Sequence, residues 1–222
     1  LDSAEKAVAA SPEDTSAAIV LARSLRARGD SAGAQRELTT RIGRHPKAPD
    51  LRAELGWTLL DRRDFAGAAA AFSEALKLAP SSIDAKTGLV TADLAEGKKA
   101  RATARINEWL EASPESPDLR VLKARVDMLS GDVASAERAL RDVIAAHPGN
   151  LDAYSLLGRL YVAKGDLDQA LVECAVQAVV LLFDVMARHV GRHGRLVEDA
   201  REIQPLGLPV LDALLGVEQV GA

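Results

Sequence analysis

The sequence has almost no cysteine and no excess of positive charge. Its 222 residues include a single cysteine, Cys174, which excludes an intrachain disulfide and a cysteine-based zinc site. The formal net charge of -4 provides no basic field for nucleic acid or for an anionic membrane. The longest fully apolar run, residues 178–183, is far shorter than the roughly 20 residues that cross a bilayer. We therefore expect neither nucleic-acid binding nor a membrane span.

Motifs that carry catalysis are also missing. The sequence contains no nucleophile motif, no phosphate-binding glycine loop and no zinc-protease motif. His189 and His193 have an i, i+4 spacing that could bring them together, but Gly191 and Gly194 disfavour a helix there and no third ligand is evident. Cys174 stands where an apolar residue is expected, and we interpret it as a buried structural thiol. We predict no enzyme activity, no catalytic residue, no cofactor and no metal.

What the sequence does contain is a period of 34 residues, which we take as the first guide to its fold. The residues that recur on this lattice are Pro46, Pro80, Pro114 and Pro148, and Ala34, Ala68, Ala102, Ala136 and Ala170. Gly-Asp pairs follow the same lattice, with Arg63-Asp64 and Gly97-Lys98 as partial exceptions. Five repeats align without insertion or deletion: 15–48, 49–82, 83–116, 117–150 and an incomplete 151–174.

Each repeat has the pattern of a helix, a turn and a second helix. In the second repeat, Leu51, Leu55 and Leu59 follow a spacing close to 3.6 residues, and the apolar pattern resumes after Asp64 until Pro80 ends it. Glycine tolerates the left-handed conformation that follows a helix, and the next aspartate can accept hydrogen bonds from the first N–H groups of the following helix. We therefore predict an all-α chain of helix pairs.

The 34-residue pattern resembles the tetratricopeptide repeat (TPR). The residues that fill the motif in the second repeat are Leu55, Gly56, Leu59, Ala68, Phe72, Ala75 and Pro80, and those around the fifth are Pro148, Tyr154, Leu157, Gly158, Tyr161 and Ala170. The resemblance implies an α-solenoid of stacked antiparallel helix pairs that wind into a right-handed superhelix. The alanine-rich, Gly-Asp-punctuated style is similar to that of bacterial arrays. No localisation follows, and cytoplasm and periplasm both stay open.

Both ends of the chain depart from the five repeats. Residues 1–14 match the second helix of a preceding repeat whose first helix is absent, so we expect a fragment of a longer array. After Cys174 the pattern fails, because Leu182 stands where the lattice predicts proline. Residues 175–222 are therefore either an atypical C-terminal helical cap or a non-native tail that follows a reading-frame error.

In the resembling family, the concave groove is lined mainly by the first helix of each repeat. Carried over by register, its principal residues here are Arg23, Arg26, Trp57, Thr91, Arg125, Met128 and Arg159, and its further positions are Ile19, Leu60, Thr87, Val121, Ser155 and Val162. Tryptophan and arginine are enriched in binding hot spots, although Trp57 could instead pack against a neighbouring helix, which is the interpretation we favour for it. The lysine and asparagine set that binds chaperone C-termini in some family members is missing.

The resemblance implies a protein-interaction scaffold that binds a peptide or helical segment of another protein in this groove. The alternative is an accessory or regulatory region of a larger enzyme or of a bacterial secretion or export assembly. The oligomeric state is not predicted.

Overall fold

The computed structural model describes residues 6, 13–173 and 175–176, and within these residues the chain forms only helices and their connecting turns. The predicted all-α class is confirmed. The predictions for residues 1–5 and 7–12, for Cys174 and for residues 177–222 lie outside the described part, and with them the His189–His193 pair. The chain divides into two compact units, an N-terminal unit Leu1–Pro114 and a C-terminal unit Glu115–Ala222.

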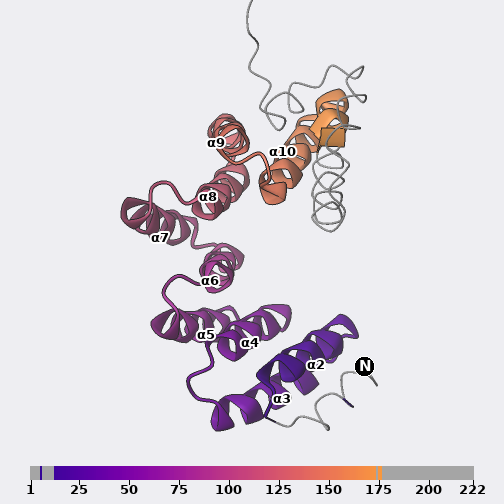
Figure 1. Ribbon diagram of the computed structural model, residues 1–222, viewed down its shortest axis with the longest axis vertical. Helices are drawn as coiled ribbons and strands as arrows, with labels where there is room; N and C mark the ends of the chain where they lie inside the picture. Colours follow the sequence, from indigo (N-terminus) through magenta and orange to yellow (C-terminus); the bar gives the residue numbers. More distant parts are fainter. Residues whose placement is uncertain (1–5, 7–12, 174, 177–222) are drawn as a thin grey trace, which may run out of the picture. The chain divides into compact units, whose positions relative to one another are not determined.

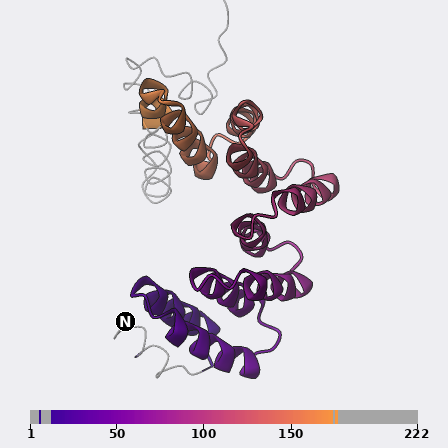
Figure 2. The ribbon, with the colours of Figure 1, turned by 180° about the vertical axis from the view of Figure 1, so that it is seen from behind.

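The N-terminal unit consists of three helix pairs. Their bounds are α2 (Thr15–Ala27) with α3 (Ser31–Arg44), α4 (Pro49–Asp61) with α5 (Phe65–Leu78), and α6 (Ile83–Ala95) with α7 (Lys99–Ala112). Each helix packs against the next one along the chain, and α4 additionally contacts α2 and α6 (Figures 1 and 2). The first helices of the three pairs therefore form one continuous layer.

The C-terminal unit repeats this arrangement. It contains α8 (Pro117–Ser130), α9 (Val133–Ala146) and α10 (Leu151–Lys164), followed by helical residues 167–173 and 175–176. Helix α9 packs against α8 and α10, and α10 also contacts α8. The first helices again lie against one another, as in the N-terminal unit.

The Gly-Asp pairs end one helix and begin the next, as their sequence predicts. Gly131 and Gly165 have φ of 88° and 78° and terminate α8 and α10 in the left-handed conformation. Asp132 then accepts a hydrogen bond from the N–H of Ser135 at 3.1 Å and caps α9. At the exceptions, Arg63 adopts φ of 62° without being glycine, and Lys98 is the N-cap residue of α7 but forms no side-chain cap.

The alanines of the lattice are buried where the helices pack together. Ala68 and Ala136 are completely buried, each within the core of its own unit. Phe72 on α5 is also fully buried, and its ring lies directly over Gly56 and Gly88. A Cβ atom added at Gly88 would lie 2.2 Å from the ring, so no larger residue fits there while Phe72 keeps its place.

Candidate functional site

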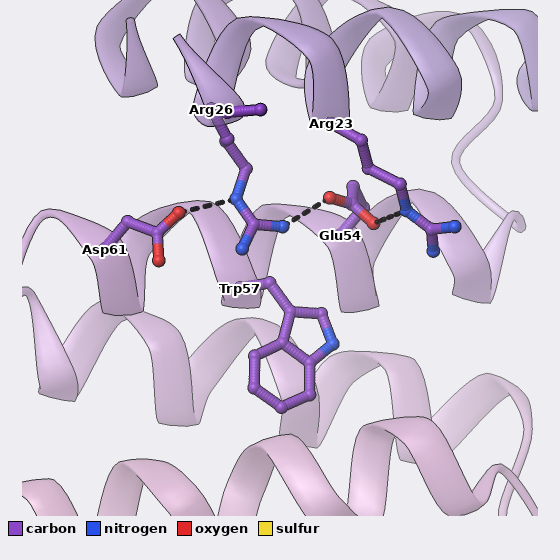
Figure 3. A pocket seen from close by; sticks show the side chains of 6 residues that line it. Arg23, Arg26, Glu54, Trp57 and Asp61 are labelled. Atoms are coloured by element: carbon purple, nitrogen blue, oxygen red, sulfur yellow. Dashed lines mark hydrogen bonds and ion pairs between the residues drawn. The ribbon is translucent and has the colours of Figure 1, made fainter. Parts of the chain in front are cut away.

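The first-helix layer of the N-terminal unit carries an open pocket of about 450 Å³, which we call the Arg–Trp pocket. The residues that line it are Arg23, Arg26 and Ala27 from α2 and Glu54, Trp57 and Asp61 from α4 (Figure 3). Three of the seven principal groove positions predicted from the repeat pattern, Arg23, Arg26 and Trp57, thus meet in one pocket.

Two carboxylates of α4 hold the two arginines of α2. Arg23 donates from Nε to Oε2 of Glu54 at 2.8 Å, and Arg26 donates from Nη1 to Oε1 of the same residue at 2.5 Å. Arg26 also donates from Nε to Oδ2 of Asp61 at 2.6 Å. Figure 3 shows Glu54 between the two guanidinium groups and Asp61 on the far side of Arg26. Both oxygens of Glu54 are therefore used within the protein.

The four charged groups differ strongly in their access to solvent. The side chain of Glu54 is only 2% exposed, whereas those of Arg23, Arg26 and Asp61 are 64%, 21% and 43% exposed. Burial alone would lower the pKa of Arg26, but the hydrogen bonds and charges of Asp61 and Glu54 outweigh it, and the pKa is raised. Arg26 therefore stays charged, and a ligand in the pocket meets the arginines and Asp61 but not Glu54.

Trp57 faces the pocket from α4 and is also tied to its neighbours. Its ring packs edge-on against Phe72, with a centroid distance of 5.2 Å and an interplanar angle of 75°. Its indole Nε1 donates a hydrogen bond to Oδ1 of Asp84 on α6 at 3.1 Å. The indole is half-buried: Trp57 packs against its neighbours and also lines the pocket, and its role in binding stays a prediction.

The other predicted groove residues differ from one another in exposure and in their contacts. Thr91 is half-buried, and its hydroxyl donates to the carbonyl oxygen of Thr87 at 2.7 Å, within its own helix. In the C-terminal unit, Arg125 and Arg159 are exposed and form no ion pair with any described residue. Met128 is half-buried and packs against the core of that unit.

The prediction that Val121 is an exposed groove residue is wrong. Its side chain is 5% exposed and belongs to the core of the C-terminal unit, together with Leu156 and Leu157 of α10. Register fixes the direction in which a side chain leaves its helix, but an apolar residue at that position packs inward against the next first helix. Ser155, at the same register position one repeat later, is exposed.

A second polar cluster in the C-terminal unit surrounds the buried Tyr161. Its hydroxyl accepts from Nη2 of Arg141 at 2.6 Å and donates to Oε1 of Glu137 at 3.2 Å. Lys164 donates to Oε2 of Glu137 at 2.9 Å, and this bond is the main cause of the lowered pKa of Glu137. Because Tyr161 is only 1% exposed, we interpret the cluster as structural support for the α9–α10 contact.

Neither a metal-binding group nor a membrane-spanning helix is found among the described residues. No group of three or more His, Cys, Asp or Glu side chains among them could hold a metal ion. None of the helices described is both long and apolar enough to cross a membrane. His45 and His147 are the C-cap residues of α3 and α9.

The repeat pattern did not identify Glu54 and Asp61 as site residues, although the register position of Glu54 could have indicated it. The same register position carries Val20, Gly88, Leu122 and Leu156 in the other repeats. A carboxylate in a column of otherwise apolar or small residues indicates a buried charge that needs partners. Asp61 gave a weaker signal, because an acidic side chain at the last residue of a helix opposes the helix dipole.

Two family models match the chain, and both are described as tetratricopeptide repeat. One matches residues 59–126 and 127–176, and the other matches residues 19–83. No curated protein matches the sequence. Tetratricopeptide repeats are in general non-enzymatic scaffolds for other proteins. The bacterial origin suggested by the style of the sequence stays a prediction.

Solved structures of tetratricopeptide repeat proteins share the fold at low sequence identity. A thermophilic TPR protein from Thermus thermophilus is 20% identical with a TM-score of 0.60, and the match covers 78% of this chain and 96% of that one. A tetratricopeptide repeat protein from Parabacteroides merdae is 17% identical with a TM-score of 0.56, covering 97% of this chain and 89% of that one. These likenesses concern the fold alone.

Proposed function

Because the chain belongs to the tetratricopeptide repeat family, we propose that it is a protein-interaction scaffold that binds a peptide or helical segment of a partner on its first helices. The observation that carries this proposal is the Arg–Trp pocket. Arg23 and the half-buried Trp57 stand at equivalent register positions of consecutive first helices, on the walls of one open pocket. Tryptophan and arginine are the residues that most often dominate binding energy at protein interfaces.

The C-terminal unit supplies a second set of residues to this proposal. Arg125 and Arg159 occupy the register position of Arg23 and Trp57, and both are exposed without an ion-pair partner among the described residues. We assign to them polar contacts with the same partner or with its neighbouring segment. Thr91 and Met128, which are half-buried, are assigned lesser contacts, each within its own unit.

The test is a selection of random peptides displayed on phage against the whole purified chain. We expect enriched peptides whose binding, measured by calorimetry, is lost in Trp57→Ala and weakened in Arg23→Ala. Arg36→Ala is the matched control, because Arg36 is an exposed arginine on the second helix α3. Circular dichroism would establish that each variant is folded.

Peptides that bind Trp57→Ala as tightly as the unchanged chain would contradict the proposal. The double variant Arg125→Ala, Arg159→Ala tests the C-terminal contribution separately. If it binds every selected peptide with unchanged affinity, these two arginines are not part of the surface.

A further inference from the structure

The Arg–Trp pocket has more free hydrogen-bond donors than free acceptors. A guanidinium group carries about five N–H donors. Arg23 donates only from Nε within the described residues, and Arg26 only from Nε and Nη1. Both oxygens of Glu54 already accept hydrogen bonds, so Asp61 is the one pocket carboxylate with an oxygen still available. The pocket can therefore donate more hydrogen bonds to a ligand than it can accept from one.

Glu54 positions the arginines rather than contacting a ligand. It is 2% exposed and bonded by both guanidinium groups, so it fixes their planes while its own charge stays out of reach. The charges that a ligand can contact are those of Arg23, Arg26 and Asp61. Although the four formal charges cancel, the accessible ones are predominantly positive.

Asp61 is held weakly and can be replaced. Its bond to Arg26 joins two side chains that are 43% and 21% exposed, and an ion pair in such a place contributes little net stability. Asp61 is also the last residue of α4, where a negative charge is unfavourable toward the helix dipole. Asp61 thus covers the Nε edge of Arg26 from a partly exposed position that a ligand can reach.

From these contacts, and resting on the proposed function, we propose that the partner segment is acidic: an Asp or Glu side chain binds Arg23 and displaces Asp61 from Arg26. An apolar residue beside this acid packs on Trp57, whose indole is fixed by Phe72 and Asp84. A carboxylate suits this place because the fork of an arginine binds its two oxygens with charge-assisted hydrogen bonds. Asp61 acts as an internal competitor that the partner's carboxylate replaces.

The experiment uses the phage-selected peptides. Their C-terminal ends are joined to the coat protein, so they carry no free C-terminal carboxylate and report on acidic side chains. We expect them to share an Asp or Glu next to an apolar residue. Changing that acid to its amide in a synthetic peptide should weaken binding at least about tenfold. The same peptide change should have a smaller effect on Arg23→Ala than on the unchanged chain, because only Arg26 is then left to bind the acid.

Asp61→Asn provides the opposite test. Removing the competitor should tighten binding of the acidic peptide by about threefold to tenfold and leave its amide analogue unchanged. Peptides that depend on Trp57 but carry no acid, or carry a lysine or arginine in its place, would overturn the acidic specificity and leave the proposed scaffold function standing. A failure to select any peptide that depends on Trp57 would overturn both.

Discussion

The two units place different side chains on the same 34-residue pattern. Where one residue of a contacting pair is larger in one unit, its partner in that unit is smaller. In the N-terminal unit, the fully buried Phe72 faces Gly88, whereas the equivalent positions of the C-terminal unit hold Leu140 and Leu156, both buried. One pair combines a large and a minimal residue, and the other combines two of medium size. Close packing thus acts on the combined volume of the pair rather than on either position alone.

The units also differ in whether a buried carboxylate accompanies their groove arginines. Where the N-terminal unit has the buried Glu54 and two arginines bonded to it, the C-terminal unit has Leu156 at the equivalent position. Its arginines Arg125 and Arg159 form no ion pair within the described residues. Of the predicted groove arginines, only Arg23 and Arg26 of the N-terminal unit are therefore held by ion pairs among the described residues, which is why the acidic specificity is assigned to that unit.

Gly88→Leu should have the largest effect, because it breaks the volume match around Phe72. Even an added Cβ would lie 2.2 Å from the ring, so we expect a loss of about 3 kcal/mol in the free energy of unfolding. Both tryptophans, Trp57 and Trp109, lie in the N-terminal unit, so tryptophan fluorescence during urea denaturation reports on that unit.

The double variant Phe72→Leu, Gly88→Leu reproduces the leucine pair of the C-terminal unit and sharpens this test. It should recover most of the stability that the single change loses. Gly43→Ala is the control, because nothing lies within 4 Å of a Cβ added there, and it should be neutral or stabilising by up to about 1 kcal/mol. A double variant no more stable than Gly88→Leu would contradict the paired-volume interpretation.

Glu54→Ala should come next, because it removes the buried carboxylate that both arginines share. We expect a loss of about 2 kcal/mol, below that of a fully enclosed ion pair because Arg23 can return to solvent. Urea denaturation followed by tryptophan fluorescence measures it. In the C-terminal unit, Arg159→Ala should change stability by less than about 0.5 kcal/mol, since its side chain is exposed. Equal losses from the two changes would remove the distinction between the units.

The helices could be predicted from the sequence because their boundaries depend on local chemistry. A glycine at positive φ, an aspartate at the N-cap and a proline after the second helix act within a few residues of the chain. The helices α2, α4, α6, α8 and α10 accordingly begin at intervals of 34 residues. Arg63 shows that the turn geometry persists when one of these local signals is absent, since it adopts the positive φ itself.

The candidate site could be predicted only in part, because its contacts join residues that lie in different repeats. Arg23 and Glu54 are 31 residues apart, and Arg26 and Asp61 are 35 apart. Register placed Arg23, Arg26 and Trp57 on the first helices, but it does not state which charges meet. Val121 failed for a related reason: its exposure depends on how the next first helix covers it, which register alone does not determine.

Unlike Gly88→Leu and Glu54→Ala, Lys98→Asp should raise the free energy of unfolding, and by a smaller amount. Lys98 is the N-cap residue of α7 and forms no side-chain cap, whereas Asp132 at the equivalent position of the C-terminal unit caps α9. An aspartate at position 98 should accept a hydrogen bond from the first turn of α7 and add about 1 kcal/mol. An upward shift of the fluorescence midpoint in urea would show it. Asp132→Lys is the reciprocal change and should lower stability by a similar amount, measured by circular dichroism.

The smallest expected effect is the pH dependence of the Tyr161 cluster. The hydrogen bond from Lys164 is the main cause of the lowered pKa of Glu137, so the native state favours the ionised carboxylate. The stabilisation by the ionised carboxylate is therefore present above the ordinary glutamate pKa of about 4.3. It is lost as the pH falls through the lowered pKa of Glu137 in the folded chain. Because Lys164 is 41% exposed, we expect Glu137→Gln to cost less than about 1 kcal/mol at neutral pH. The difference in stability from the unchanged chain, measured by circular dichroism in urea, should shrink in acid.

Tryptophan fluorescence provides the control for this prediction. Since the ion pairs of Glu137 belong to the C-terminal unit, the fluorescence transition of the N-terminal unit should not change in Glu137→Gln. A difference that grew as the pH fell would mean that the carboxylate is not stabilised by Lys164.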